Sequence, residues 1–145
     1  MSFQWLQMRI SEERDRRSRE AMITERLPRA VQELHANLGQ CIEAYTSAFG
    51  PQSADVMLAG LKIRVVVREE QDGRWQPRGK VEVVGDPGLP GFSIERPNNE
   101  PLMIEVGMLP GDKVYYRDLE LDQFLTMEEL TRRILDRAMF PKLKE

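Results

Sequence analysis

Nucleophilic and metal chemistry in proteins depends largely on cysteine and histidine, and this chain of 145 residues contains one of each. His35 and Cys41 lie six residues apart, in a segment whose apolar residues have helical spacing. Six residues turn a helix through about 240°, so the two side chains diverge and make a poor catalytic dyad. A metal site needs clustered histidine, cysteine or carboxylate ligands. We therefore predict no catalytic residue and no metal site.

Two further patterns are compatible with chemistry but have simpler explanations. The glycines of residues 85–91 could cradle a phosphate if a helix followed them, but a strand-like segment follows and two prolines remove N–H donors. We interpret this segment as a surface connection, with a loop over a ligand cavity as the alternative. Acid–base catalysis by Asp118, Glu120 or Asp122 would require burial, which sequence does not reveal. We expect no cofactor, and an enzyme is the last of the functional hypotheses.

The N-terminal segment combines an apolar tip with a charged middle. Residues 12–20 hold eight charged side chains in nine positions, four basic and four acidic. This neutral balance argues against nucleic-acid binding, and acid-before-base pairs such as Glu13 and Arg17 stabilise an exposed helix. We predict a helical arm over residues 1–26. The apolar residues of its tip are a candidate protein interface, because tryptophan and methionine are enriched there: Phe3, Trp5, Leu6, Met8 and Ile10. The alternative is that the tip packs on its own sheet.

Residues 27–49 have the strongest helical pattern in the chain. Their apolar residues alternate at spacings of four and three, which places them on one side of a core helix: Leu27, Val31, Leu34, Leu38, Cys41, Tyr45 and Ala48. Gly50 and Pro51 indicate its end. Pro28 favours a bend or a new helix start, so we predict an N-terminal helix pair bent near Pro28.

From residue 60 to residue 119 the apolar period changes to two, which predicts an antiparallel meander of about five strands. Asp72-Gly73 joins the first two strands as a hairpin, and Pro77 suggests a bulge or an edge. Pro110-Gly111 indicates a further turn. Basic side chains are expected on the non-core side of the first hairpin, at Lys62, Arg64, Arg68, Arg78 and Lys80.

A C-terminal helix over residues 126–139 begins with a capping box of Thr126 and Glu129. The fold class that these elements predict is α+β, with the helices on one face of an antiparallel sheet. We expect residues 1–145 to form a single domain.

Composition narrows the class of function. The net charge is −3, without the basic excess that nucleic-acid binding requires. No run approaches the ~20 apolar residues of a membrane span, a single cysteine forms no internal disulfide, and no signal-peptide pattern is present, so we expect a cytoplasmic protein.

The expected function is a non-catalytic protein-interaction or assembly module that acts as a homo-oligomer or binds a protein partner through the N-terminal helix. The alternative is a carrier of a small apolar ligand between helix and sheet. Methionines would give such a carrier adaptable walls, at Met57, Met103, Met108 and Met127.

Overall fold

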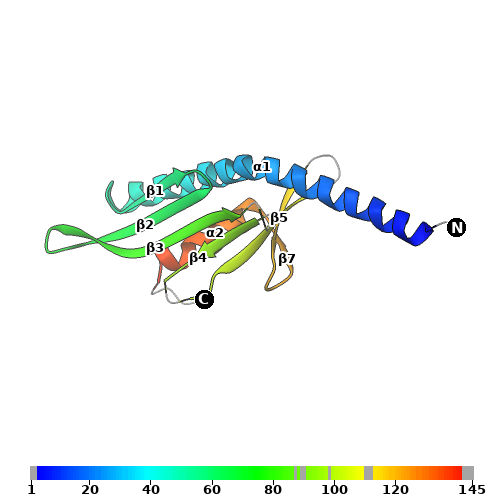
Figure 1. The fold of residues 1–145 in the computed structure, drawn as a ribbon. Helices are drawn as coiled ribbons and strands as arrows, with labels where there is room; N and C mark the ends of the chain where they lie inside the picture. Colours follow the sequence, from blue (N-terminus) through cyan, green and yellow to red (C-terminus); the bar gives the residue numbers. More distant parts are fainter. Residues whose placement is uncertain (1–2, 87, 89–90, 98, 110–112, 142–145) are drawn as a thin grey trace.

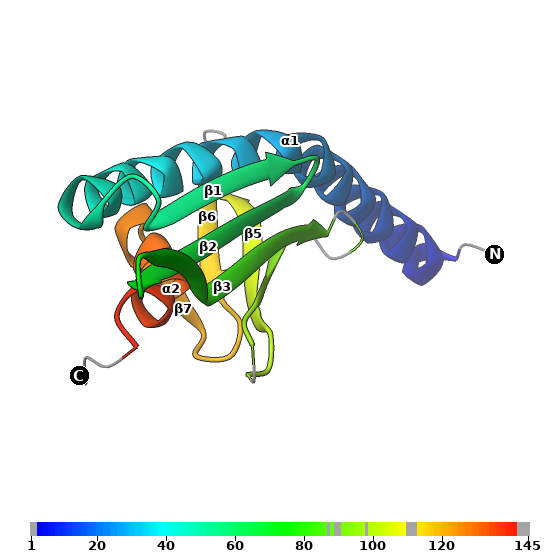
Figure 2. The ribbon, with the colours of Figure 1, turned by 90° about the vertical axis from the view of Figure 1, so that its left-hand side faces the viewer.

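The computed structural model describes residues 3–86, 88, 91–97, 99–109 and 113–141. It begins with one long helix, α1 (Gln4–Phe49), of 46 residues. The expected helix pair is therefore one continuous bent helix with Pro28 inside it (Figures 1 and 2). A proline removes one backbone hydrogen bond, which kinks a helix but does not end it where the flanking residues are held. Here Leu27, Ala30 and Val31 are buried on either side of the proline and hold it in the helix.

The first half of α1 projects beyond the sheet as an arm (Figures 1 and 2). Between residues 3 and 26, all the side chains that the structure describes are exposed or half-buried. From Leu27 onward the helix lies along the sheet and contributes Leu34, Leu38 and Ile42 to the core.

The sheet is an antiparallel meander in which each strand pairs with the next one along the chain. Its members are β1 (Ala54–Ala59), β2 (Lys62–Gln71), β3 (Arg74–Asp86), β4 (Gly91–Glu95), β5 (Leu102–Leu109), β6 (Lys113–Asp118) and β7 (Gln123–Leu125). The sequence predicts β2 to β6, so the expected count of about five strands is too low and the sheet extends beyond residues 60–119. Exposed Met57 obscures the alternation of β1, and β7 has three residues, too few to show a period.

The β2–β3 hairpin confirms two predictions and corrects a third. Asp72 and Gly73 have φ values of 54° and 77°, the positive pair of a type I′ turn. The register shifts after Val67 and skips Arg78, which forms the bulge that Pro77 suggested. The prediction for Arg78 is wrong because the bulge turns its side chain to the helix side. There its guanidinium donates to the carbonyl oxygens of Met139 at 2.6 Å and Ala138 at 3.3 Å, at the end of α2.

The core lies between one face of the sheet and the two helices, which confirms the α+β prediction. Helix α2 (Met127–Met139) has the predicted capping box: Glu129 N donates to Thr126 Oγ1 at 3.1 Å, and Thr126 N donates to Glu129 Oε1 at 3.2 Å. Buried side chains from every layer fill this space, including Leu34, Phe92 and Ile134. The predicted turn at Pro110-Gly111 lies outside the described residues. Neither described helix is both long and apolar enough to cross a membrane.

Candidate protein interface

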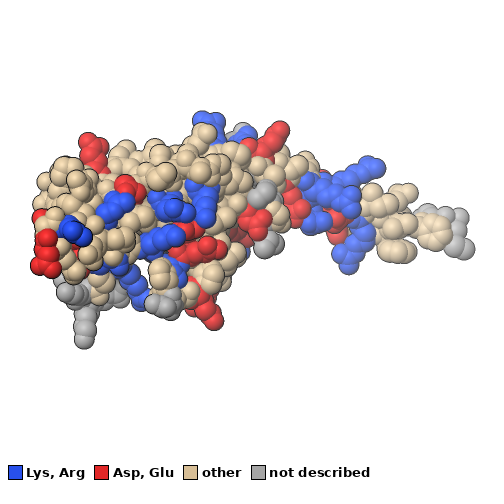
Figure 3. Space-filling model, turned by 60° about the vertical axis from the view of Figure 1, so that its left-hand side comes forward, with Lys and Arg blue, Asp and Glu red and all other residues tan. Residues whose placement is uncertain are grey.

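The apolar tip of α1 is an exposed group of hydrophobic side chains. The five side chains of the tip have exposed fractions between 42% and 67%: Phe3, Trp5, Leu6, Met8 and Ile10. In the space-filling view the described end of the arm shows no charged side chains beyond a band of Lys, Arg, Asp and Glu (Figure 3). The alternative that the tip packs on its own sheet is therefore wrong for this structure. Contiguous exposed apolar surface of this kind is typical of interaction sites.

The tip continues the helical pattern of the core segment. Leu6 and Leu27 are separated by three heptads, as are Ile10 and Val31. A straight helix drifts by about 20° per heptad, so the tip's apolar side is turned by about 60° from the side that packs on the sheet. In the arm between them, charged residues such as Glu13 and Arg17 take the positions that apolar residues hold on either side. Helix α1 thus has two apolar segments, the tip and the core segment, separated by a charged one.

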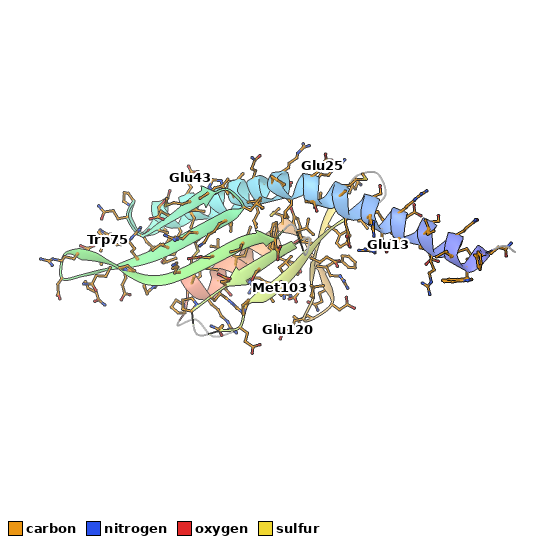
Figure 4. All side chains as sticks on the ribbon, viewed as in Figure 1. Glu13, Glu25, Glu43, Trp75, Met103 and Glu120 are labelled. Atoms are coloured by element: carbon orange, nitrogen blue, oxygen red, sulfur yellow. The ribbon has the colours of Figure 1, made fainter. Side chains whose placement is uncertain are left out.

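Ion pairs within the helix order the charged middle of the arm. Arg17 Nε lies 3.1 Å from Glu13 Oε1, as predicted, and Arg16 bonds to Glu13 and, at 2.5 Å, to Glu20. Hydrogen bonds from these two arginines, of which the bond from Arg16 has the larger effect, lower the pKa of Glu13 to about 2. Glu13 carries its charge on the arm, well away from the sheet (Figure 4). Such exposed pairs favour helix formation locally and leave the apolar tip uncovered.

The structure separates the residues that sequence analysis considered for chemistry. His35 and Cys41 are both half-buried on α1. Asp118 is fully buried, whereas Glu120 and Asp122 are exposed in the β6–β7 turn. Among the described residues, no three histidine, cysteine or carboxylate side chains are grouped as metal ligands would be. Most of the glycine-rich connection, at residues 87, 89 and 90, lies outside the described part of the chain.

Of the methionines that were expected to wall a ligand cavity between helix and sheet, those whose side chains the structure describes do not lie together. Met57 and Met103 lie on the outer face of the sheet, and Met127 is half-buried beside the core. They cannot wall a common cavity between helix and sheet. An apolar crevice of about 610 Å³ instead opens where the ends of α1, α2 and the β2–β3 hairpin meet. Tyr45 lines it, with ring centroids 4.8 Å from Phe49 and 5.9 Å from Phe140, and Trp75 of the hairpin also lines it (Figure 4).

Sequence reasoning missed a polar cleft beside α2. It has a volume of about 730 Å³ and lies between α2, the residue after β4, and the β6–β7 turn. The buried Asp118 lines this cleft. Its Oδ1 accepts from Glu120 N at 2.9 Å and Leu121 N at 3.2 Å, and its Oδ2 accepts from Arg133. Arg133 also donates to Gln123 Oε1 at 3.0 Å. Glu129 lies four residues before Arg133 on α2, but its carboxylate bonds to Thr126 in the capping box.

Comparison of the chain with protein-family models, curated proteins and solved structures gave no match.

Proposed function

We propose that the protein is a non-catalytic, cytoplasmic interaction module that assembles with a second copy of itself through the apolar tip of α1. The observation that supports this most directly is the exposure of the tip. Two helical turns hold five apolar side chains, two of them aromatic, that no described residue of the same chain buries. Aromatic side chains contribute much of the binding energy when an interface buries them.

The charged middle of the arm favours a second copy over a strongly charged partner. Residues 12–20 carry four positive and four negative side chains, so they have no net attraction for an acidic or a basic surface. Two such segments lying side by side can place acids opposite bases, because both signs are interspersed along each helix. The apolar tips would then supply affinity, and the charged segments would limit which partners fit.

A pair of methionine substitutions tests the proposal with a matched control. Met8 on the tip and Met57 on the outer sheet face have nearly equal exposed fractions, 64% and 62%. We expect sedimentation velocity to show a dimer for the wild type, a monomer for Met8→Glu and a dimer for Met57→Glu, because only the tip substitution places a charge in the interface. Circular dichroism checks that both variants keep the helical content of the wild type.

Fluorescence of Trp5 provides a second readout. The chain has two tryptophans, so a Trp75→Phe variant isolates the signal of Trp5. Its emission should move to shorter wavelength as the protein concentration rises, since association removes the indole from water. A wild type that stays monomeric up to about 100 μM, where even weak specific complexes form, would contradict the proposal. So would a dimer that Met57→Glu dissociates and Met8→Glu does not.

The apolar crevice at Tyr45 favours a second candidate function, the carriage of a small apolar ligand. Its volume of about 610 Å³ is within the range of ligand sites. Native mass spectrometry of freshly purified protein would detect a retained ligand, and a Trp5→Phe variant would report its binding through Trp75. Without a retained ligand or a Trp75 response to apolar probes, this candidate fails and the interface proposal is unaffected.

A further inference from the structure

The polar cleft beside α2 contains more cationic hydrogen-bonding capacity than its own chain uses. Five residues of α2 at helical spacing form one wall, at positions 129, 132, 133, 136 and 137, and Arg96 stands on the strand side with Leu102. The Nε of Arg96 is buried and has no hydrogen-bond partner. A buried donor without a partner is uncommon in folded proteins and calls for a specific explanation, such as a bound ion or water.

Contacts within the cleft show which side chains already have hydrogen-bonding partners. Asp118 accepts from Arg133, Arg132 lies 4.0 Å from Asp136, and Glu129 serves in the capping box. Among the described residues, none pairs with the guanidinium groups of Arg96 and Arg137.

The hydrogen-bonding capacity that remains is cationic. Glu120 is the one lining carboxylate for which the described residues provide no side-chain partner, and it is exposed at the edge of the molecule opposite α1 (Figure 4). The four arginines and four carboxylates of the lining balance in formal charge, so an anion would be held by the unused donors of Arg96 and Arg137 and not by a net positive charge.

We propose that this cleft binds the oxyanion group of a small organic molecule, a phosphate or a carboxylate, between Arg96 and Arg137. A guanidinium group presents paired N–H donors that match both oxyanions, and the anion would satisfy the buried Nε of Arg96. Arg137 lies in the last turn of α2, where the helix dipole stabilises its charge, and none of the described residues uses its donors. Leu102 and Leu121 offer apolar surface to the organic part. This inference is independent of the proposed assembly through α1.

Three probes separate what the oxyanion and the organic part of a ligand each contribute to binding: inorganic phosphate, phenyl phosphate and benzoate. The two aromatic probes share a ring and differ in the oxyanion, and inorganic phosphate lacks the ring. Titrations followed by amide chemical shifts at ~150 mM salt, where general electrostatic attraction is screened, should show saturable changes around Arg96 and Leu121. Tighter binding of phenyl phosphate would identify a phosphorylated ligand, and tighter binding of benzoate a carboxylate.

Substitutions assign the binding to the two arginines. Arg96→Gln and Arg137→Gln should each weaken the preferred probe by about tenfold or more, while Arg74→Gln should stay within about twofold. Arg74 is exposed on the hairpin away from the cleft, so this control removes the same charge. Arg96→Lys should bind the preferred probe hardly better than Arg96→Gln does, because an ammonium group lacks the paired donors of a guanidinium group.

Stability of the ligand-free protein gives a readout that a structural arginine would not produce. Removing an unsatisfied buried donor does not remove a native hydrogen bond, so Arg96→Met should keep or raise the Tm while losing the increase in Tm that the probe causes. Saturable binding that survives both Arg96→Gln and Arg137→Gln would overturn the proposal. Absence of binding for all three probes up to about 10 mM, or a fall in Tm of ligand-free Arg96→Met, would do the same.

Discussion

The buried ion pair of Asp118 and Arg133 permits a prediction in which the two partners contribute unequally. Asp118 is fully buried, whereas the side chain of Arg133 is 27% exposed. If a substitution removes the negative charge of Asp118, the guanidinium group of Arg133 remains partly hydrated and keeps its hydrogen bond to Gln123. If Arg133 is removed, the Asp118 carboxylate stays buried with two backbone N–H donors as its remaining partners. The loss of the arginine should therefore destabilise the fold more than the loss of the negative charge.

The expected magnitudes follow from this difference. Leaving a buried charge unpaired costs about 3–5 kcal/mol, and the two remaining N–H donors place Arg133→Met near the lower end, about 3 kcal/mol. In Asp118→Asn the side-chain oxygen still accepts from both N–H groups, so we expect about 1–2 kcal/mol. The double variant contains no buried charge and should also lose about 1–2 kcal/mol, which makes Asp118→Asn a suppressor of Arg133→Met.

Urea unfolding and thermal unfolding, both followed by circular dichroism at one protein concentration, measure these differences. For a chain of this length, 3 kcal/mol corresponds to a fall in Tm of about 6–12 °C. Arg132→Met is the control, because that neighbour is 74% exposed and 4.0 Å from its partner, and should cost less than about 1 kcal/mol. The reasoning is refuted if Arg133→Met is no more destabilising than Asp118→Asn, or if the losses in the double variant simply add.

Three further substitutions can be tested with the same unfolding assays. The pKa of Glu82 is lowered to about 2 by hydrogen bonds from two lysines, so the stability it contributes is present above about pH 4.5 and is lost as the pH falls toward 2. The difference in Tm between the wild type and Glu82→Gln should shrink over that interval, and a constant difference would argue against the pairing. In Gly91→Ala the new Cβ would lie 2.3 Å from the carbonyl oxygen of Ile104, so the backbone must shift and we expect a loss of about 1–3 kcal/mol in urea unfolding. Thr126→Ala removes the N-cap of α2 and should cost about 1 kcal/mol, or about 2–4 °C in Tm, whereas Thr126→Ser should be near neutral.

Elements that depend on near neighbours were predictable. The β2–β3 hairpin depends on the two turn residues Asp72 and Gly73, and the capping box depends on residues three positions apart. The core helix depends on a spacing of three and four that persists from Leu27 to Ile42. Each of these signals depends on residues no more than about four positions apart in the chain. The tertiary environment agrees with these local preferences and reinforces them.

Elements that depend on distant partners were not predictable. β7 has three residues and is a strand because β6 pairs with it. The bulge turned Arg78 toward Met139, which is 61 positions away in the chain. Arg133 reaches back 15 positions to Asp118, although the sequence offers it an acidic residue one turn earlier.

By itself, the sequence determined that the chain has an apolar helical tip, a neutral charged segment, a core helix, a meander and a capped last helix, because residue type and spacing set local conformation. Only the tertiary structure decided that the tip lies beyond the sheet and that Arg96 and Arg137 line one cleft. Both outcomes depend on where the chain places surfaces that are far apart in sequence, and burial and charge pairing between such surfaces have no local signature.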